Sequence, residues 1–422
     1  MSRTTTMLQP PNPISSPVDV LLADVAIRIQ LSHTDYERAT QRYRTINEWI
    51  ERDGSPLKDR VQLFYPQGSM ATGSTAASRL RTDEFDIDVA AQLDLPPDVP
   101  PSIALGLLYE AVRGEPGSRY YRVTKRRTRC VTIDYADNMH LDVTPMVRQA
   151  GTPERESVIF HHRAEAPHEP SYRLIANPYG FAEWFKETTP LDHDFSLSYQ
   201  SRARDYERMI ALMRADSEVV PPQEPPFRKS KAVIVLQLLK RWRNVQYDTR
   251  PGRRPPSILI SKLVADSANA TDSLSEELRH QARSMWAEFQ RWHEAGKLIH
   301  VENPRCPQDV LTDRWPESLV EQAVFVDDLT MFVAKIERLV SGCALDEMRK
   351  IMIELFGETS TADVFRAFNR RQGAEIRHGQ SQHVPGAGGL VVPAGVVAGS
   401  TAASPRTRPT PNHTFYGEHS EG

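Results

Sequence analysis

The fold is decided by the stretch Gln67-Gly68-Ser69-Met70 and the segment that follows it, Asp83-Glu84-Phe85-Asp86-Ile87-Asp88. Gly68 has no side chain, so the backbone at this position can approach a phosphate group closely. Ser69 adds a hydroxyl, and the neighbouring backbone N–H groups can form a concave site for an anion. The first motif therefore predicts a phosphate-binding turn.

The second motif predicts a β-strand that carries two carboxylates on one face. Asp86 and Asp88 are two residues apart, and alternate residues of a strand project to the same side. Ile87 then projects to the opposite side, where a hydrophobic core would contain it. Asp142 lies in a second apolar segment, His140-Leu141-Asp142-Val143, and we expect it to bring a third carboxylate alongside.

Three carboxylates on one face repel each other unless a cation lies between them. Hard divalent ions such as Mg²⁺ prefer oxygen ligands. Two such ions, about 3.5–4 Å apart, stabilise both the attacking and the leaving oxygen of a phosphoryl transfer. We therefore predict that Asp86, Asp88 and Asp142 bind two Mg²⁺ ions, with Mn²⁺ as a substitute. Gly-Ser turns and Asp-x-Asp pairs are each common by chance, but their ordered combination with a third Asp favours this functional interpretation.

The chain has 422 residues, enough for two domains and terminal tails. Its 52 Lys and Arg residues are balanced by 55 Asp and Glu residues, whereas an obligate nucleic-acid-binding protein usually has a basic excess. The cysteines Cys130, Cys306 and Cys343 are far apart and show neither a zinc pattern nor a disulfide framework. Because the chain shows no apolar signal segment and no membrane-spanning stretch, we expect a cytoplasmic protein without a membrane partner.

The hydrophobic pattern predicts an α+β fold with two lobes. Apolar residues recur with a helical period from residue 18 to about residue 52, as one long helix or two. Strand-like segments follow at residues 63–65, 85–95, 120–123, 130–135 and 139–147, and helical segments dominate after residue 229. We expect a disordered lead over residues 1–17, a mixed-sheet lobe with the N-terminal helix over residues 18–215, a helical lobe over residues 216–377 and a flexible tail over residues 378–422.

Two polar clusters have both a structural and a functional interpretation. Basic residues are concentrated between Arg119 and Arg129, and we favour a solvated strand edge for each of them, with attraction of a triphosphate as the alternative. His161, His162 and His168 lack the spacing of a zinc site, so a polar loop is the preferred interpretation.

The assembled motifs resemble a known superfamily. Gln67-Gly68-Ser69, Asp86-Ile87-Asp88 and Asp142 resemble the signature of polymerase-β-like, template-independent nucleotidyltransferases. The segments 238–242 (Leu-Leu-Lys-Arg-Trp), 255–257 (Pro-Pro-Ser) and Asn303-Pro304 leading to Trp315 resemble the oligoadenylate synthetase and cyclic GMP-AMP synthase branch, and within it the bacterial CD-NTases of anti-phage CBASS systems. The resemblance covers about residues 18–368. It implies a polymerase-β-like lobe, a helical lobe and nucleotide binding in the cleft between them.

The resemblance also implies an activity. CD-NTases join nucleoside triphosphates into a cyclic di- or trinucleotide messenger with release of pyrophosphate, and an effector protein responds to the product. The alternatives are a synthase of linear oligonucleotides, or a transferase that acts on a small molecule or an RNA end. A catalytically inactive binding module is a further alternative, and the presence of all three Asp residues argues against it.

Site roles carry over to the matching positions. Gln67 and Ser69, on either side of Gly68, would contact the phosphates of the donor nucleotide. Asp86 and Asp88 would bind both metal ions, and Asp142 would complete the metal site beneath the acceptor 3′-hydroxyl. The other lobe would hold the triphosphate through two further residues, Lys240 and Ser257; the alternative for Lys240 is a solvated helix lysine, and we expect Ser257 to cap a helix.

Two positions depart from the family pattern, and the tail raises a separate question. Ile258 replaces the aromatic residue that often stacks on the donor base in this family. No Cys/His cluster matches the zinc insertion of animal cyclic GMP-AMP synthase, so we do not expect direct activation by double-stranded DNA. Gly422, on a flexible tail, fits conjugation by an E1/E2-like partner, as in many similar CD-NTases; the alternative is an inert tail.

Overall fold

The computed structural model describes residues 13–14, 16–77, 84–152, 155–166, 168–213, 229–269, 271, 273–377, 381–383, 391–393 and 408–409. Most of the expected lead lies outside these residues, although Ser16 and Pro17 already begin the first helix. Gly422, the predicted conjugation site, also lies outside them. No helix of the described part is long and apolar enough to cross a membrane.

The first lobe is built on one mixed sheet. Its strands are β1 (Val61–Pro66), β2 (Phe85–Leu93), β3 (Thr124–Arg126), β4 (Val131–Asp134), β5 (Met139–Arg148), β6 (Ser157–His161) and β7 (Tyr172–Ala176). The order is β1-β2-β5-β4-β3, with β6 paired to β5 and β7 paired to β6. Strands β2 and β5 are parallel, and the other pairs are antiparallel. The expected mixed sheet is therefore confirmed.

One face of this sheet is the core of the lobe. Helices α2 (His33–Ile50) and α4 (Pro101–Arg113) cover it, and their apolar side chains form one buried cluster with those of the strands. Phe85, Ile87 and Val89 are buried, whereas Asp86 and Asp88 alternate with them and are less buried. The alternation expected from the sequence thus sends the two carboxylates to the face opposite the core.

The second lobe is a bundle of helices around α7 (Lys231–Tyr247). Every residue of α7 from Lys231 to Asn244 is buried. A helix buried on all sides lies at the centre of its domain. Its neighbours are α8 (Ser257–Asp266), α9 (Leu274–Glu294), α10 (Leu319–Val340), α11 (Leu345–Phe356) and α12 (Glu358–Arg377). The helical lobe predicted from the sequence is confirmed, and the fold class is α+β.

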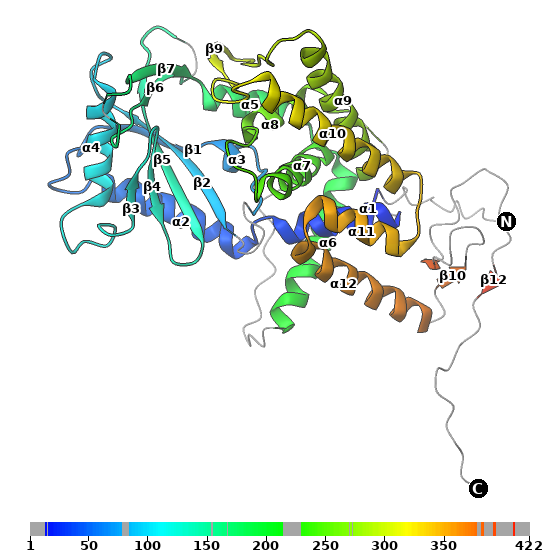
Figure 1. Ribbon diagram of the computed structural model, residues 1–422. Coiled ribbons are helices and arrows are strands. Elements are labelled where there is room, and N and C mark those ends of the chain that lie inside the picture. Colours follow the sequence, from blue (N-terminus) through cyan, green and yellow to red (C-terminus); the bar gives the residue numbers. More distant parts are fainter. Residues whose placement is uncertain are drawn as a thin grey trace, which may run out of the picture.

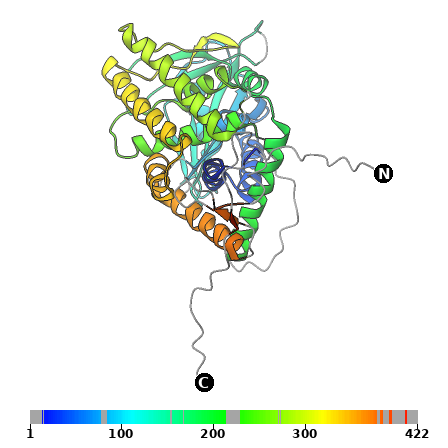
Figure 2. The ribbon, with the colours of Figure 1, turned by 90° about the vertical axis from the view of Figure 1, so that its right-hand side faces the viewer.

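Three elements that precede residue 215 pack with the helical lobe. Helices α1 (Pro17–Ile29), α5 (Pro178–Thr188) and α6 (His193–Met213) contribute apolar side chains to the same buried cluster as α7. Figure 2 shows α1 nearly end-on, with α6 in green and α12 in orange beside it, and both contact it. The N-terminal helical segment is therefore two helices, of which α1 belongs to the helical bundle and α2 to the sheet lobe (Figure 1).

The break between α1 and α2 lies against the loop that follows the Gly-Ser motif. Gln30 pairs with Ala76 as an isolated β-bridge, and the Ala77 N–H donates to the Ile29 carbonyl at 2.8 Å. Ser32 then caps α2 through the backbone N–H of Asp35. The junction of the two lobes is thus fastened to residues 74–77.

The expected tail includes three short strands. β10 (Ser381–His383) pairs with β11 (Val391–Pro393) and with β12 (Arg408–Pro409), both antiparallel. The expectation of a flexible tail over residues 378–422 stays a prediction. Backbone groups pair across extended segments without large apolar side chains, which is why composition did not reveal the strands.

A two-stranded hairpin joins the lobes on the other side of the cleft. It consists of β8 (Glu302–Asn303) and β9 (Cys306–Val310), and β9 packs beside β7. Asn303 is buried, and its side-chain amide donates to the Asn177 carbonyl at 2.9 Å and to Asp309 Oδ2 at 2.8 Å. Asn177 caps α5 through the Gly180 N–H. The Asn-Pro motif therefore fixes the start of a helix that lines the cleft.

Asn303→Ala should lower the free energy of unfolding by about 1–3 kcal/mol, because it removes the hydrogen bonds that the buried Asn303 amide donates to the Asn177 carbonyl and to Asp309 Oδ2. Chemical denaturation monitored by circular dichroism measures the change. Asn369→Ala, on the exposed side of α12, is the control and should change stability by less than about 0.5 kcal/mol. Equal effects of the two substitutions would contradict the proposed contribution of Asn303.

Candidate active site

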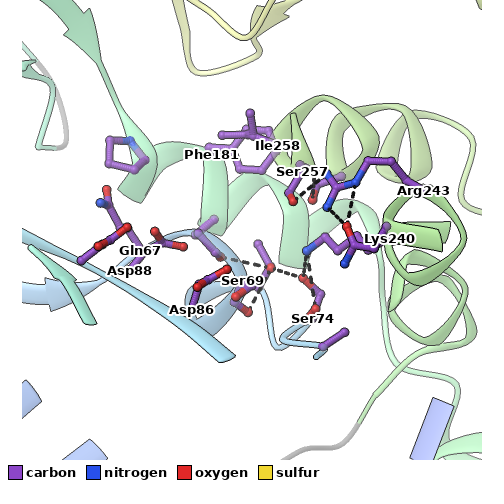
Figure 3. Close-up of a pocket in the computed structure, with 18 of the residues that line it drawn as sticks. Gln67, Ser69, Ser74, Asp86, Asp88, Phe181, Lys240, Arg243, Ser257 and Ile258 are labelled. Atoms are coloured by element: carbon purple, nitrogen blue, oxygen red, sulfur yellow. Dashed lines mark hydrogen bonds between the residues drawn. The ribbon is translucent and has the colours of Figure 1, made fainter. Parts of the chain in front are cut away.

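A cavity of about 420 Å³ lies between the two lobes. Its walls include all eight site residues predicted from the described part of the chain: Gln67, Gly68, Ser69, Asp86, Asp88 and Asp142 from the sheet lobe, and Lys240 and Ser257 from the helical lobe. Figure 3 shows the carboxylates and the Gly-Ser turn facing the lysine and serine across this space. Residues separated by as many as 190 positions therefore meet in one cleft.

The carboxylates are placed by the parallel pairing of β2 with β5. Asp88 lies directly opposite Asp142 in the register, and Asp86 is two residues before Asp88 on the same face. The pKa of Asp88 is raised to about 7, chiefly by burial and then by the charges of Asp142 and Asp86, while Lys240 opposes them. Burial also raises the pKa of Asp142, against a hydrogen bond that Thr132 Oγ1 donates to its Oδ1 at 2.5 Å. The pair therefore resists carrying two negative charges.

The donor set fits a hard divalent cation. All three side chains offer oxygen, and a cation between them would remove the repulsion that raises the pKa of Asp88. Within the described residues, no three His, Cys, Asp or Glu side chains are gathered closely enough to hold an ion as they stand.

Gly68 touches this carboxylate group directly. Its φ is +56°, a left-handed conformation, and a Cβ at this position would lie 2.6 Å from Asp88 Oδ2. The short helix α3 (Gly68–Ala71) begins here, and Ser69 Oγ accepts a hydrogen bond from Thr75 Oγ1 at 3.2 Å. The Gln67 side-chain amide donates to Thr144 Oγ1 at 3.0 Å. Glycine is thus required both by the backbone angle and by the neighbouring Asp88.

Lys240 extends from the buried helix α7 toward the loop after α3. Its Nζ donates to Ser74 Oγ at 2.7 Å (Figure 3). The pKa of Lys240 is lowered to about 7, chiefly by burial and also by the charge of Arg243, while Asp88 opposes the shift. An amine this deeply buried becomes more fully charged when an anion lies next to it, as a phosphate would.

Arg243 and Asn244 were not singled out by sequence reasoning, although both line the cavity. Arg243 Nη1 donates to Ser257 Oγ at 3.0 Å and to the Pro255 carbonyl at 2.7 Å. Asn244 Oδ1 accepts from Arg243 at 2.8 Å and from Arg254 at 3.2 Å. The pKa of Arg243 is lowered to about 9, chiefly by burial and also by the charge of Arg254. The sequence held one signal for both residues: they lie one helical turn after Lys240, and residues at that spacing share a helix face.

Ser257 has a different local role from the one expected. Pro256 is the N-cap of α8, and Ser257 is the first helical residue. Its hydroxyl accepts from Arg243, so its own proton remains available to a ligand in the cavity. Beside it, Ile258 and Phe181 form an apolar part of the wall (Figure 3).

A family model described as the Second Messenger Oligonucleotide or Dinucleotide Synthetase (SMODS) domain matches residues 18–188. The chain is also 36% identical to the cyclic dinucleotide synthase CdnG of Bradyrhizobium diazoefficiens over 401 residues, which is 94% of each protein. That CdnG is a CD-NTase whose structure contains GTP; it superimposes with a TM-score of 0.74 over 85% of this chain and 99% of CdnG. This chain belongs to the CD-NTase family.

Two more distant proteins are also similar to this chain. A c-di-GMP synthase of Roseivirga ehrenbergii is 23% identical over 94% of this chain and 96% of the relative. The structure of CdnC from Escherichia coli with ATP matches at 14% identity with a TM-score of 0.54, over 81% of this chain and 98% of CdnC, which shows the fold alone. The expected family, the polymerase-β-like fold and the enzyme class are confirmed: the protein is a nucleotidyltransferase that makes cyclic oligonucleotides from nucleoside triphosphates, and the family implies a role in anti-phage defence.

Gly68→Ala should lower kcat by about a hundredfold or more, because its Cβ displaces the Asp88 carboxylate and a shift of about 1 Å at a catalytic group has this effect. Pyrophosphate release measures the loss. Gly54 is the matched control, with a φ of +80° and no heavy atom within 4 Å of an added Cβ. Gly54→Ala should cost about 1 kcal/mol of stability and retain activity, and a similar loss of kcat in both variants would contradict the contact with Asp88.

The pKa of Lys240 predicts a pH dependence of nucleotide binding. The lysine is charged below about pH 7 and loses its proton above it, so affinity for a nucleoside triphosphate should fall as pH rises from 7 to 9. The fall is at most about tenfold per pH unit for one proton. Lys240→Arg should remove this component, because arginine stays charged throughout. Calorimetric titrations without divalent cations test this, and identical slopes for both proteins would show that another group titrates.

Proposed function

We propose that this CD-NTase joins two nucleoside triphosphates, GTP among them, into a cyclic dinucleotide. The supporting observation is the cavity itself, in which three carboxylates from the sheet lobe face a buried lysine and a serine from the helical lobe. The relatives named as a cyclic dinucleotide synthase, a c-di-GMP synthase and a GTP-bound CD-NTase favour this product and this base.

Residues of both lobes would hold the triphosphate of the donor nucleotide. Lys240 supplies positive charge, and Ser257 donates its hydroxyl proton to a phosphate oxygen because Arg243 already occupies its lone pair. The turn at Gly68 and Ser69 brings backbone close to the phosphates from the opposite side. Such charge-assisted contacts are worth roughly 1.5–3 kcal/mol each. The donor's α-phosphorus is then held next to the carboxylates.

Asp86, Asp88 and Asp142 would hold two Mg²⁺ ions, or Mn²⁺ in their place. When bound, these ions supply neutralisation of the phosphate charge and a lower pKa for the acceptor hydroxyl. Thr132 orients Asp142 through its hydrogen bond to Oδ1. Burial raises the pKa of Asp142, which makes it a better acceptor for the hydroxyl proton.

In each transfer, the site accounts for the bond formed, the bond broken and the proton released. The acceptor oxygen forms a bond to the α-phosphorus, the bond from that phosphorus to the bridging oxygen breaks, and pyrophosphate leaves with the electron pair. The proton of the acceptor hydroxyl passes to Asp142. The linear dinucleotide then rebinds with its remaining triphosphate as the donor, and its free hydroxyl closes the ring. The alternative products, a linear oligonucleotide or a transfer to another acceptor, differ from this one in mass.

The wild-type protein with GTP and Mg²⁺ should release two pyrophosphates per product and give the mass of a cyclic dinucleotide. The double substitution Asp86→Asn with Asp88→Asn should abolish both signals. Its melting temperature should not fall, because the change removes repulsion between buried carboxylates. Undiminished synthesis by the double variant would refute the assignment of the carboxylates, and a wild-type product without ring closure would support the linear alternative.

A further inference from the structure

An aromatic pair stands on the sheet outside the residues assigned so far. The ring of His161 stacks on the ring of Tyr172, with centroids 4.4 Å apart and an interplanar angle of 9°. His161 ends β6 and Tyr172 begins β7, and the two residues are direct partners in the register. Tyr172 is 40% exposed. The stack therefore offers a flat ring to solvent.

The strand register places this stack on the same face as the catalytic carboxylates. Asp142 and Met146 are four residues apart on β5, and Met146 is paired with Ile159 of β6. His161 follows Ile159 by two residues, so it projects to the face of Asp142. The pairing of β5 with β6 ends at Met146 and Ile159, and His161 lies two residues beyond it, on the side of β5 toward Asp142. With strands about 4.8 Å apart and about 3.3 Å per residue, the stack begins on the order of 10 Å from Asp142.

Guanidinium groups surround the stack. Arg129 Nε donates to His161 Nδ1 at 3.4 Å, and Arg129 Nη2 donates to Asp313 Oδ2 of the helical lobe at 2.6 Å. Burial lowers the pKa of His161, and the charges of Arg129, Arg314 and Arg163 lower it further, so the imidazole is neutral near pH 7. The two lobes thus meet a second time, over the sheet face that carries the carboxylates.

Arg314 is the cation of this cluster that has no acceptor. Arg129 is paired with Asp313, and Arg163 is paired with Glu169 at 2.7 Å. The guanidinium of Arg314 makes no hydrogen bond or ion pair with any residue that the structure describes. Burial lowers its pKa, and Arg129 and Arg253 lower it further. Arg314 is half-buried, and the charges of Asp313 and Tyr172 oppose the lowering of its pKa. A cation without a hydrogen-bonded acceptor next to an aromatic ring can bind a nucleotide, since the ring stacks on a base and the cation meets a phosphate.

The reaction creates a need for such a place. Two triphosphates enter each first transfer, and only the donor's triphosphate lies at Lys240 and Ser257. The acceptor presents its hydroxyl at Asp142 while its base and its own triphosphate extend beyond the donor cavity.

We propose that the His161–Tyr172 stack and Arg314 form the subsite of the acceptor nucleotide, with its base on Tyr172 and its 5′-polyphosphate on Arg314. This inference rests on the proposed function, because it assumes an acceptor that is itself a nucleoside triphosphate. Arg129 acts as a positioning residue, since its bonds to His161 and Asp313 hold the stack against the helical lobe.

The test separates acceptor from donor. Labelled 2′,3′-dideoxyguanosine triphosphate has no hydroxyl for extension and acts only as a donor. GMP has no pyrophosphate to lose and acts only as an acceptor. The acceptor with a triphosphate is GTP in which a methylene group replaces the oxygen between the α- and β-phosphorus, so that it cannot act as a donor; GTP as acceptor denotes this analogue below. The KM of each acceptor is measured at saturating labelled donor, and the KM of the donor is measured at saturating GMP.

Tyr172→Ala should raise the acceptor KM about tenfold for both GMP and GTP, the order expected for one lost base stack. The donor KM should not change, and Tyr172→Phe should behave as wild type because it keeps the ring. An unchanged acceptor KM in Tyr172→Ala, or an equal change in the donor KM, would overturn the proposal.

Arg314→Gln should raise the KM of GTP as acceptor about tenfold while changing the KM of GMP less, because only GTP carries the polyphosphate. Arg283→Gln, which removes an exposed arginine paired with Glu337 on the outer helices, is the matched control and should change neither. Equal effects on GTP and GMP would overturn the assignment of Arg314. This variant also keeps the test decisive if Tyr172→Ala lowers the melting temperature. Failure of the proposed function is distinguishable: a wild type that joins no nucleotides would form no labelled dinucleotide, and a wild type that does not close the ring would give only linear products from unmodified GTP.

Discussion

The active site depends on a buried carboxylate in one lobe and a buried amine in the other. Asp88 and Lys240 each lie beneath the surface, and each shifts the pKa of the other toward its charged form. Neither charge is stable alone in such surroundings, because burial opposes both. The pairing of β2 with β5 fixes Asp88, and the bond to Ser74 fixes Lys240. The charges of Asp88 and Lys240 therefore stabilise each other only when the two lobes are joined.

For this reason, the central helix of the second lobe, α7, contains several buried cations. Lys240, Arg241 and Arg243 are consecutive or nearly so, and all are buried. Each has hydrogen-bond acceptors: Arg241 donates to the Phe356 carbonyl at 3.0 Å and to Ser360 Oγ at 2.8 Å, while Arg243 donates to Pro255 and Asn244. Buried cations need such partners. One helix thus serves as the core of its lobe and as the basic wall of the cleft.

The sequence predicted those parts of the molecule in which apolar and polar residues repeat over a few positions, as they do along a strand or a helix. The alternation around Ile87 predicted the strand and the orientation of Asp86 and Asp88, and the sheet, the helical lobe and the cleft between them followed from the motifs and the family they resemble. The packing of α1, α5 and α6 with the helical bundle could not be predicted from the sequence. An apolar helix face shows that the helix is covered, but not which lobe covers it. The His161–Tyr172 stack was also hidden, since a strand register decides which distant residues meet. In the same way, Arg243 acquires its meaning from Ser257, which lies on another helix.

The break between α1 and α2 sets the geometry of any motion between the lobes. Helices α1 and α2 have 13 and 18 residues, so they form lever arms of about 20 and 27 Å on either side of Gln30. Gln30 is held there by Lys229 Nζ at 2.6 Å and by the Tyr199 hydroxyl at 3.1 Å. A tilt of about 10° would carry the far end of the longer arm through about 5 Å, by the same rise per residue. Residues 74–77, the loop that follows the Gly-Ser motif, are bonded next to Gln30, about which such a tilt would occur. This loop would therefore move least when the angle between the lobes changes.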